Sequence, residues 1–303
     1  MSIIILGSYL RALVMTTERI PVVGETLLGR DFRQTFGGKG SDMAVQAARL
    51  GADVKFLGVI GTDMFGDEFV ELMKQEGIGI EGLHQTSKLA TGAGFIIKDE
   101  AAKNVIVIDM GANSLFGKDD ITAHEGLIAS GKIALAQLEV PIETALFGLQ
   151  KAKDAGLTTI LNPAPAQDLR GVDLGCVDIL TPNETEARVA LGLDPSDPLS
   201  HEDVARQLME TGVGAVVMTL GEDGVAGFTS EGSFTIPPYK VEVVDSNGAG
   251  DCFNASLAVG LSEGMAMEDA ATFASRVAAL CCTRWETVPS YHTRQEVEAI
   301  LAQ

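Results

Sequence analysis

The sequence has few basic residues for its length. Its 22 lysines and arginines stand against 42 aspartates and glutamates, which gives a formal net charge of −20. Nucleic acids and anionic membranes attract basic proteins, so this balance argues against either as a partner. The apolar run at residues 3–6 is far too short for a signal peptide or a membrane span.

Cysteine and histidine are also scarce. The four cysteines have no C-x-x-C spacing, and in a chain of 303 residues they indicate reduced thiols and a cytoplasmic protein. The four histidines are scattered, so the sequence has no zinc motif.

Two common nucleotide-binding signatures are missing. No G-x-x-x-x-G-K-[ST] occurs, so the chain is not a P-loop enzyme. Residues 77–82, GIGIEG, match G-x-G-x-x-G, but they follow a predicted helix where a dinucleotide fingerprint must follow a strand. We therefore expect a loop at residues 77–82.

What remains is the pattern of an α/β protein. With 46% hydrophobic and 21% charged residues the chain can bury a sizeable core. From residue 119 onward predicted strands alternate with predicted helices, among them a helix at 119–130 and a strand at 177–181. Such alternation indicates a mainly parallel sheet that is covered on both faces.

Two segments do not follow this alternation. Residues 9–35 are broken by Pro21 and Gly24 and have the pattern of exposed strands outside the main sheet. Residues 92–98 and 104–110 predict a hairpin around the polar turn at 98–103. Together these segments predict a small second sheet.

The stretch DSNGAGDCFNASLAVGLSEG at residues 245–264 runs from a turn into a helix. The small residues Gly248, Ala249 and Gly250 stand at the helix N-terminus, where backbone N–H groups and the helix dipole favour an anion. Asp251 lies in the first helical turn. It is either an ordinary N-terminal carboxylate or the base beside a phosphate-binding turn.

A second glycine cluster, GGKGSD at residues 37–42, also opens a predicted helix. It is either a structural turn or a binding site in which Lys39 and Asp42 supply polar groups. Glu139 follows a predicted buried strand, and ligands of open α/β sheets bind at the carboxyl ends of strands. Glu139 either caps the next helix or belongs to such a site.

Two further strands end in polar residues. Asn183 and Glu186 have the spacing of a capping box, and the alternative is that they orient Mg²⁺ and its waters near phosphates. Thr219 and Gly221 end another strand, where a nucleotide could lie.

Taken in order, GGKG, QLE, LNPAPA, TPNETEA, TLGEDG and DSNGAGDCFNA resemble the ribokinase group of the PfkB carbohydrate kinase family over essentially the whole chain. The resemblance implies a single domain over residues 1–303, a doubly wound, mainly parallel α/β sandwich. It also implies a β lid from residues 9–35 and 91–110. In this group the lid often clasps a second subunit, so a homodimer is implied.

The resemblance further implies an enzyme that uses ATP and Mg²⁺ to phosphorylate a primary hydroxyl of a small sugar. Asp251 would be the catalytic base, and Gly248, Ala249 and Gly250 the anion hole. The sugar would be contacted by Gly37, Gly38, Lys39 and Glu139, and ATP by Asn183, Thr219, Gly221, Gly224 and Gly250. Mg²⁺ would be held by Asn183 and Glu186. A monovalent cation, K⁺, would be held by Asp245, Asn247 and Ser290.

The sequence departs from the family in the residues that read the sugar. Where the family has INAD this chain has Tyr9-Leu10-Arg11-Ala12, and where the family has GGKGAN this chain ends in Asp42. Strand alternation would place Leu10 and Ala12 on the sugar side and Arg11 on the other. We therefore expect an acceptor other than plain D-ribose, such as a deoxy sugar or a ketose.

Three other readings of the function stay open from the sequence. They are a D-ribose kinase after all, a nucleoside kinase of the same superfamily, and a sensor of sugar or nucleotide without turnover. The loop implied to bind the monovalent cation also departs from the family, because residues 284–290 lack its glycine.

Overall fold

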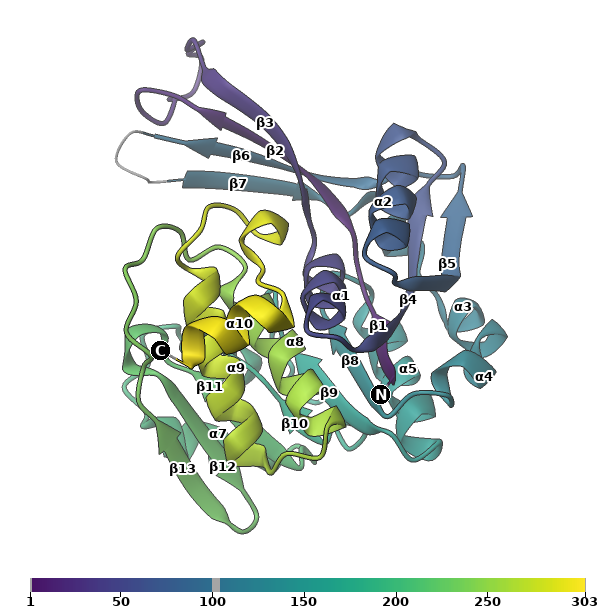
Figure 1. Cartoon of the computed structure of the whole chain (residues 1–303), viewed down its shortest axis with the longest axis vertical. Coiled ribbons are helices and arrows are strands. Elements are labelled where there is room, and N and C mark those ends of the chain that lie inside the picture. Colours follow the sequence, from purple (N-terminus) through teal and green to yellow (C-terminus); the bar gives the residue numbers. More distant parts are fainter. Residues whose placement is uncertain (1, 100–103, 303) are drawn as a thin grey trace.

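The computed structural model describes residues 2–99 and 104–302. A nine-stranded sheet forms the centre of the molecule, and a four-stranded sheet lies beside it (Figure 1). The large sheet consists of β1 (Ser2–Leu6), β4 (Asp53–Gly61), β5 (Gly79–Thr86), β8 (Ile133–Gln137), β9 (Thr158–Asn162), β10 (Ile179–Leu180), β11 (Ala215–Thr219), β12 (Val225–Thr229) and β13 (Gly232–Ile236).

The large sheet has the order β13-β12-β11-β10-β9-β8-β1-β4-β5. Its strands pair in parallel except at one edge, where β12 and β13 are antiparallel. β1 reads as an unbroken apolar run because both of its faces are buried: Ile3 and Ile5 belong to one core, and Ile4 and Leu6 to the other. The predicted mainly parallel sheet is therefore confirmed.

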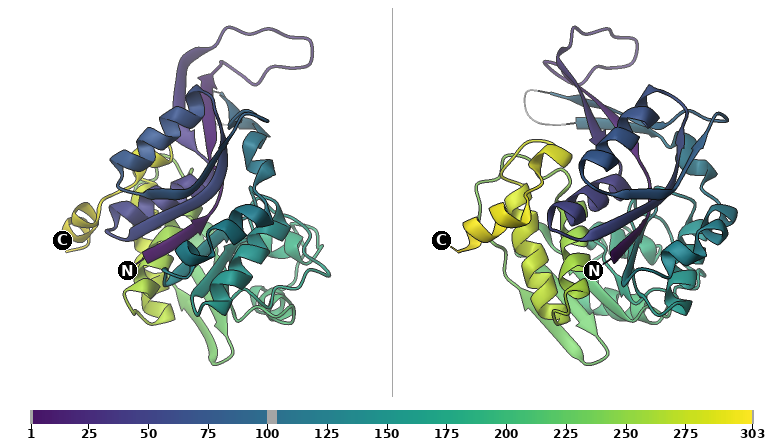
Figure 2. Two further views of the ribbon diagram at one scale, coloured as in Figure 1. Left: turned by 90° about the vertical axis from the view of Figure 1, so that its right-hand side faces the viewer. Right: turned by 45° about the vertical axis from the view of Figure 1, so that its right-hand side comes forward.

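Helices cover both faces of this sheet (Figure 2). One face packs against α1 (Lys39–Arg49), α2 (Met64–Gln75), α8 (Ala249–Ser262), α9 (Met267–Cys281) and α10 (Arg294–Leu301). The other face packs against α3 (Lys118–Ala123), α4 (Glu125–Ile128), α5 (Ile142–Asp154), α6 (Glu184–Ala190) and α7 (His201–Met209). Short 3-10 helices occur at η1 (Gly111–Leu115), η2 (Gly221–Asp223) and η3 (Val288–Ser290). Within residues 2–99 and 104–302 no helix has the length and apolarity to cross a membrane.

The four-stranded sheet is the second sheet that the sequence predicts. Its order is β3-β2-β6-β7, with β2 (Leu10–Thr16), β3 (Arg30–Gly37), β6 (Gly92–Lys98) and β7 (Asn104–Asp109). β2 and β6 are parallel, and the two outer strands pair antiparallel to them. Residues 100–103 of the expected hairpin turn lie outside the described residues.

Several local predictions are wrong. Residues 79–82 are not a loop but the start of β5, and glycine occurs there because a Cβ on Gly82 would lie 2.5 Å from Leu57 of β4. The helix expected at 119–130 breaks at His124, whose ring Nδ1 donates a hydrogen bond to the carbonyl of Asp120 at 2.8 Å. The strand expected at 177–181 has only two paired residues. The strand at the start of residues 9–35 is not exposed, since Leu10 and Val14 are buried.

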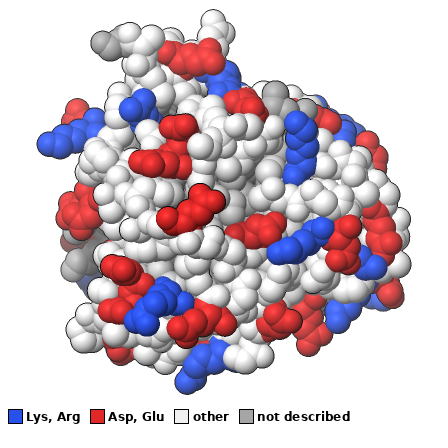
Figure 3. All heavy atoms as spheres, turned by 90° about the horizontal axis from the view of Figure 1, so that it is seen from below, with Lys and Arg blue, Asp and Glu red and all other residues white. Residues whose placement is uncertain are grey.

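The excess of acidic residues is visible on the surface. Figure 3 shows one face, on which acidic side chains are scattered among fewer basic ones. On this face the negative charge is therefore spread out.

Candidate active site

The large sheet changes direction between β1 and β8. From β1 the sheet grows through β4 and β5, and from β8 it grows the other way through β9, β10 and β11. Ligands of open α/β sheets bind at the carboxyl ends of strands at such a point. Ser8 follows β1 and donates its hydroxyl to Oε2 of Glu139, which follows β8, at 2.6 Å. A buried carboxylate thus lies at the point where the sheet changes direction.

Glu139 also holds the start of α1. Its Oε2 accepts the backbone N–H of Lys39, the first residue of that helix, at 2.7 Å. The helix that follows Glu139 has Pro141 at its N-cap, so Glu139 does not cap it. Gly40 allows the close approach, because a Cβ there would lie 2.4 Å from the backbone nitrogen of Ser8. The GGKG cluster is therefore a tight packing of α1 against the end of β1, and it also faces a pocket.

Asp42 lies in the first turn of α1 and is 3% exposed. Its Oδ1 lies 3.4 Å from Oγ1 of Thr287. Burial raises the pKa of Asp42 well above its usual range, and the carboxylates of Asp251 and Glu139 raise it further. The shift favours the protonated form of Asp42, in which the carboxyl group can donate as well as accept a hydrogen bond.

The glycine-rich turn opens α8 as the sequence predicts. Gly248 is the N-cap, with φ at +78°, and no side chain caps the helix. A Cβ at Gly248 would lie 2.7 Å from the hydroxyl of Tyr291, whereas a Cβ at Gly250 would meet no atom within 4 Å. The turn is thus tightly packed at Gly248 and open at Gly250, while the N–H of Ala249 donates to the carbonyl of Ser246 at 3.3 Å. An uncapped helix N-terminus of this kind suits an anion.

Asp251 follows this turn and is 7% exposed. Its Oδ1 lies 3.8 Å from Nζ of Lys39 and has no hydrogen-bond partner in the part of the chain that the structure describes. Burial raises the pKa of Asp251 to about 6, while the Lys39 ammonium opposes this shift. A carboxylate that is ionised above pH 6 and lacks a hydrogen bond can accept a proton from a bound hydroxyl.

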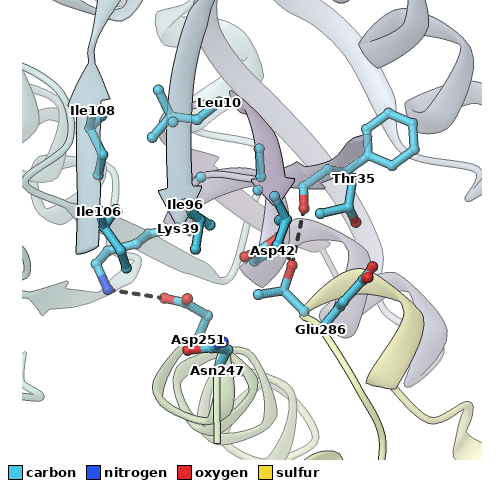
Figure 4. Close-up of a pocket in the computed structure, with 18 of the residues that line it drawn as sticks. Leu10, Thr35, Lys39, Asp42, Ile96, Ile106, Ile108, Asn247, Asp251 and Glu286 are labelled. Atoms are coloured by element: carbon cyan, nitrogen blue, oxygen red, sulfur yellow. Dashed lines mark hydrogen bonds and ion pairs between the residues drawn. The ribbon is translucent and has the colours of Figure 1, made fainter. Parts of the chain in front are cut away.

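These groups line one pocket between the two sheets (Figure 4). Its polar end is formed by Gly37, Gly38, Lys39, Asp42, Glu139, Asn247, Gly248 and Asp251. Its apolar wall comes from the small sheet: Leu10, Ala12, Val14, Ile96, Ile106 and Ile108. The structure thus brings the predicted acceptor-binding residues together, and it places Leu10 and Ala12 on the pocket side as predicted.

Other lining residues were missed by sequence reasoning. They are Thr35, Lys98, Glu286 and Thr287 and the three isoleucines of β6 and β7. Strand alternation offers a signal for β6, where Gly94, Ile96 and Lys98 share the pocket face. Nothing local marks Glu286 or Thr287, which reach the pocket from the loop after α9.

Arg11 points away from the pocket, as the alternation predicts. Its guanidinium forms an ion pair with Glu68 of α2 at 3.0 Å and lies 5.0 Å from the centre of the Phe36 ring. Arg11 therefore fastens the small sheet to α2 and is not available to a ligand in the pocket.

The residues expected at ATP lie outside this pocket, at the ends of neighbouring strands. Asn183 follows β10 and forms a bridge with Thr219 at the end of β11. Asn183 and Glu186 complete a reciprocal capping box, with both bonds at 2.8 Å. Gly221 and Gly224 flank the turn after β11, and Gly224 must be glycine, because a Cβ would lie 2.1 Å from the carbonyl of Ile236.

The residues expected around a monovalent cation also come together. Asp245 accepts the N–H of Asn247 at 3.1 Å. Cys281 contacts both Ser290 Oγ, at 3.1 Å, and the carbonyl of Asn247, at 3.9 Å. Lys98 of the small sheet reaches the same place, with its Nζ 3.7 Å from Asp245 Oδ2.

The model of the pfkB family carbohydrate kinases matches residues 1–294. The chain belongs to the PfkB family of carbohydrate kinases. It is 36% identical to a ribokinase of Haemophilus influenzae over 96% of this chain and 95% of that protein. It is also 33% identical to a deoxyribokinase of Salmonella typhi over 84% of this chain and 83% of that protein. The crystal structure of a ribokinase from Thermotoga maritima superposes with a TM-score of 0.90 at 32% identity, covering 99% of each chain.

This PfkB kinase therefore has the ribokinase-like fold that the motifs imply, and it is an ATP-dependent carbohydrate kinase. Relatives of similar identity bear the names of different acceptors, so overall identity does not decide which sugar it takes. The choice of acceptor has to be argued from the pocket.

Proposed function

We propose that this kinase phosphorylates a primary hydroxyl of a small sugar other than plain D-ribose, with Asp251 as the base. The observation that carries the proposal is the apolar wall of the pocket. Leu10 and Ala12, on the pocket face of β2, stand where the family has an amide and a carboxylate.

The wall cannot satisfy the hydroxyls of ribose. Leu10 and Ala12 are at most 9% exposed, so a hydroxyl placed against them loses water and gains no partner. Each unsatisfied group costs about 1–3 kcal/mol. Two such losses would lower kcat/KM by roughly 10²–10⁴.

The opposite end of the pocket is polar. Asp42, Glu139 and Asp251 gather there and can bind hydroxyls next to the reacting carbon. The acceptor should therefore carry hydroxyls at one end and C–H groups at the end that faces the small sheet. A deoxy sugar meets this description.

The chemistry follows from the arrangement around Asp251. The acceptor oxygen attacks the γ-phosphorus of ATP, its proton passes to the carboxylate of Asp251, and ADP leaves. The N–H groups at residues 248–250 would bind the transferring phosphoryl group, where negative charge is concentrated. The Lys39 ammonium lowers the pKa of Asp251 and so favours its ionised form.

ATP would lie along the ends of β10 and β11, contacting Asn183, Thr219, Gly221, Gly224 and Gly250. The capping box uses Oε2 of Glu186, which leaves its Oε1 to hold a water of Mg²⁺. The residues present therefore fit the metal. Bound with ATP, Mg²⁺ would neutralise phosphate charge.

The small sheet would act as a lid over the acceptor and as the contact with a second copy of the chain. Its outer face carries a row of exposed apolar side chains in register, with Phe95 opposite Val107 and Met15 in line with Val105. Such a face on a four-stranded sheet needs cover. An identical lid, related by a twofold axis, would supply it.

A screen of ADP release tests the proposed acceptor. We expect kcat/KM for D-ribose to be roughly 10²–10⁴ lower than for the best of a panel of deoxy sugars, ketoses and sugar acids. A maximum at D-ribose would overturn the proposal, and a maximum at a nucleoside would replace it with the nucleoside kinase. No ADP release with any acceptor would favour the sensor.

A further inference from the structure

The carboxylate of Asp245 lies directly upstream of the turn that opens α8. Its Oδ1 accepts the N–H of Asn247, and its Oδ2 accepts the N–H of Glu286, both at 3.1 Å. The side chain is 8% exposed. Asp245 therefore fixes the geometry of the turn up to Gly248, and its negative charge needs compensation in a nearly dry place.

Lys98 supplies this compensation. Its Nζ lies 3.7 Å from Asp245 Oδ2, and its side chain is 18% exposed. The ammonium also lies 5.9 Å from the centre of the Trp285 ring, which covers it on another side. Lys98 is the last residue of β6 and is held between Thr16 of β2 and Asn104 of β7, so its backbone is fixed.

Ser290, another residue implied to bind a monovalent cation, contacts other groups of the protein. Ser290 donates its hydroxyl to the carbonyl of Thr287 at 2.7 Å and lies 3.1 Å from Cys281 Sγ. The carboxylate of Asp245, which would hold the cation, is already paired with the ammonium of Lys98. Because a K⁺ at this carboxylate would be repelled by the ammonium, the residues present do not fit a bound K⁺.

We propose that the Lys98 ammonium provides at Asp245 the single positive charge that a bound K⁺ would provide, so that this kinase needs no monovalent cation. Lys98 is then a positioning residue: it acts through Asp245 on the turn at Gly248. The charge is carried by the small sheet, so it reaches Asp245 only when that sheet lies over the pocket. The inference rests on the proposed role of the turn at residues 248–250.

The test uses the full-length enzyme with Mg²⁺, ATP and the best acceptor. Rates are measured from 0 to about 100 mM KCl, with tetramethylammonium chloride holding the ionic strength constant, because that ion is too large for a potassium site. The variants are Lys98→Met, which removes the charge, and Lys98→Arg, which keeps it. Lys88→Met, which removes the charge of an exposed lysine outside the small sheet, is the matched control.

We expect the wild type and Lys88→Met to show no response to K⁺. Lys98→Met should lose about 10- to 100-fold in kcat, which corresponds to roughly 1.4–2.8 kcal/mol, and should regain rate as K⁺ is added. Lys98→Arg should stay within a few-fold of wild type. The single tryptophan, Trp285, gives a readout that does not depend on turnover: its fluorescence should respond to K⁺ in Lys98→Met and not in the wild type.

Three results would overturn the inference. The first is that K⁺ activates the wild type several-fold. The second is that Lys98→Met is as fast as the wild type without K⁺. The third is that Lys98→Met and Lys98→Arg lose the same amount of activity, which would make the role of the side chain structural. Failure of the proposed chemistry is seen separately, because Asp251→Asn would then keep its activity whatever Lys98 does.

Discussion

Replacing Asp251 by asparagine should stabilise the protein while removing its activity. The substitution keeps the shape of the side chain and removes both the charge and the proton acceptor. Loss of a general base lowers kcat by roughly 10²–10⁴. The stability change follows from the burial of the carboxylate at the start of α8.

The magnitude comes from the shifted pKa of Asp251. Folding raises this pKa from 3.8 to about 6, and each pKa unit corresponds to about 1.4 kcal/mol, so ionised Asp251 costs the folded state about 3 kcal/mol. The Lys39 ammonium already opposes the shift, so this cost includes the attraction that the substitution removes. We therefore expect a net gain of about 1–3 kcal/mol at pH 7.5.

The sign of the pH dependence is fixed by the direction of the shift. Below pH 4 Asp251 is protonated in both the folded and the unfolded state, so its ionisation costs the fold nothing. Between pH 4 and 6 the unfolded state releases its proton first, and the cost of ionisation grows. The gain from Asp251→Asn should be small at pH 4 and complete above pH 6.

Urea unfolding at pH 4, 5, 6 and 7.5, with kcat measured on the same preparations, checks both halves of this prediction. Asn254→Asp would not serve as a control, because Asn254 donates to the carbonyl of Gly250 at 2.8 Å. Asp67→Asn serves instead, because Asp67 is exposed and lies in the first turn of α2 as Asp251 lies in the first turn of α8. A variant that is destabilised equally at all four pH values, or one with kcat within a few-fold of wild type, would refute the reasoning.

Three further predictions concern the metal, the lid and the packing of α1. Glu186→Gln should raise the Mg²⁺ concentration needed for half-maximal rate, and an unchanged Mg²⁺ titration would leave Glu186 as a capping residue only. Phe95→Lys should convert a dimer to a monomer in sedimentation at micromolar protein, and a wild type that is already monomeric would count against the lid contact. Gly40→Ala should destabilise the fold by about 1–3 kcal/mol and raise KM, because its Cβ would lie 2.4 Å from the backbone of Ser8; Gly126→Ala, where a Cβ meets nothing within 4 Å, should do neither.

The parts of the fold that follow from local pattern could be predicted from the sequence. β1 is an apolar run because both of its faces are buried, and such a run can be recognised in the sequence alone. The glycines at 38 and 248 stand where φ is positive at helix starts, which the motifs indicate. The alternation along β2 correctly separated Leu10 and Ala12 from Arg11.

The rest depends on contacts between distant segments. Nothing in the sequence near Lys98 shows that its ammonium reaches Asp245, because that contact is made only when the small sheet packs against the loop after α9. Thr287 reaches Asp42 in the same way. At the break at His124 the imidazole ring donates a hydrogen bond to the carbonyl of Asp120, a contact that helix propensity does not capture.

The most direct test of the proposed acceptor specificity is to restore the polar wall. Leu10→Asn with Ala12→Asp should raise kcat/KM for D-ribose by roughly 10²–10⁴ relative to the best acceptor of the wild type, because two unsatisfied hydroxyls regain partners. Leu13→Asn, on the opposite face of β2, should leave the preference unchanged. A wild-type enzyme that phosphorylates D-ribose as well as any other sugar, with no gain from the double substitution, would contradict the account.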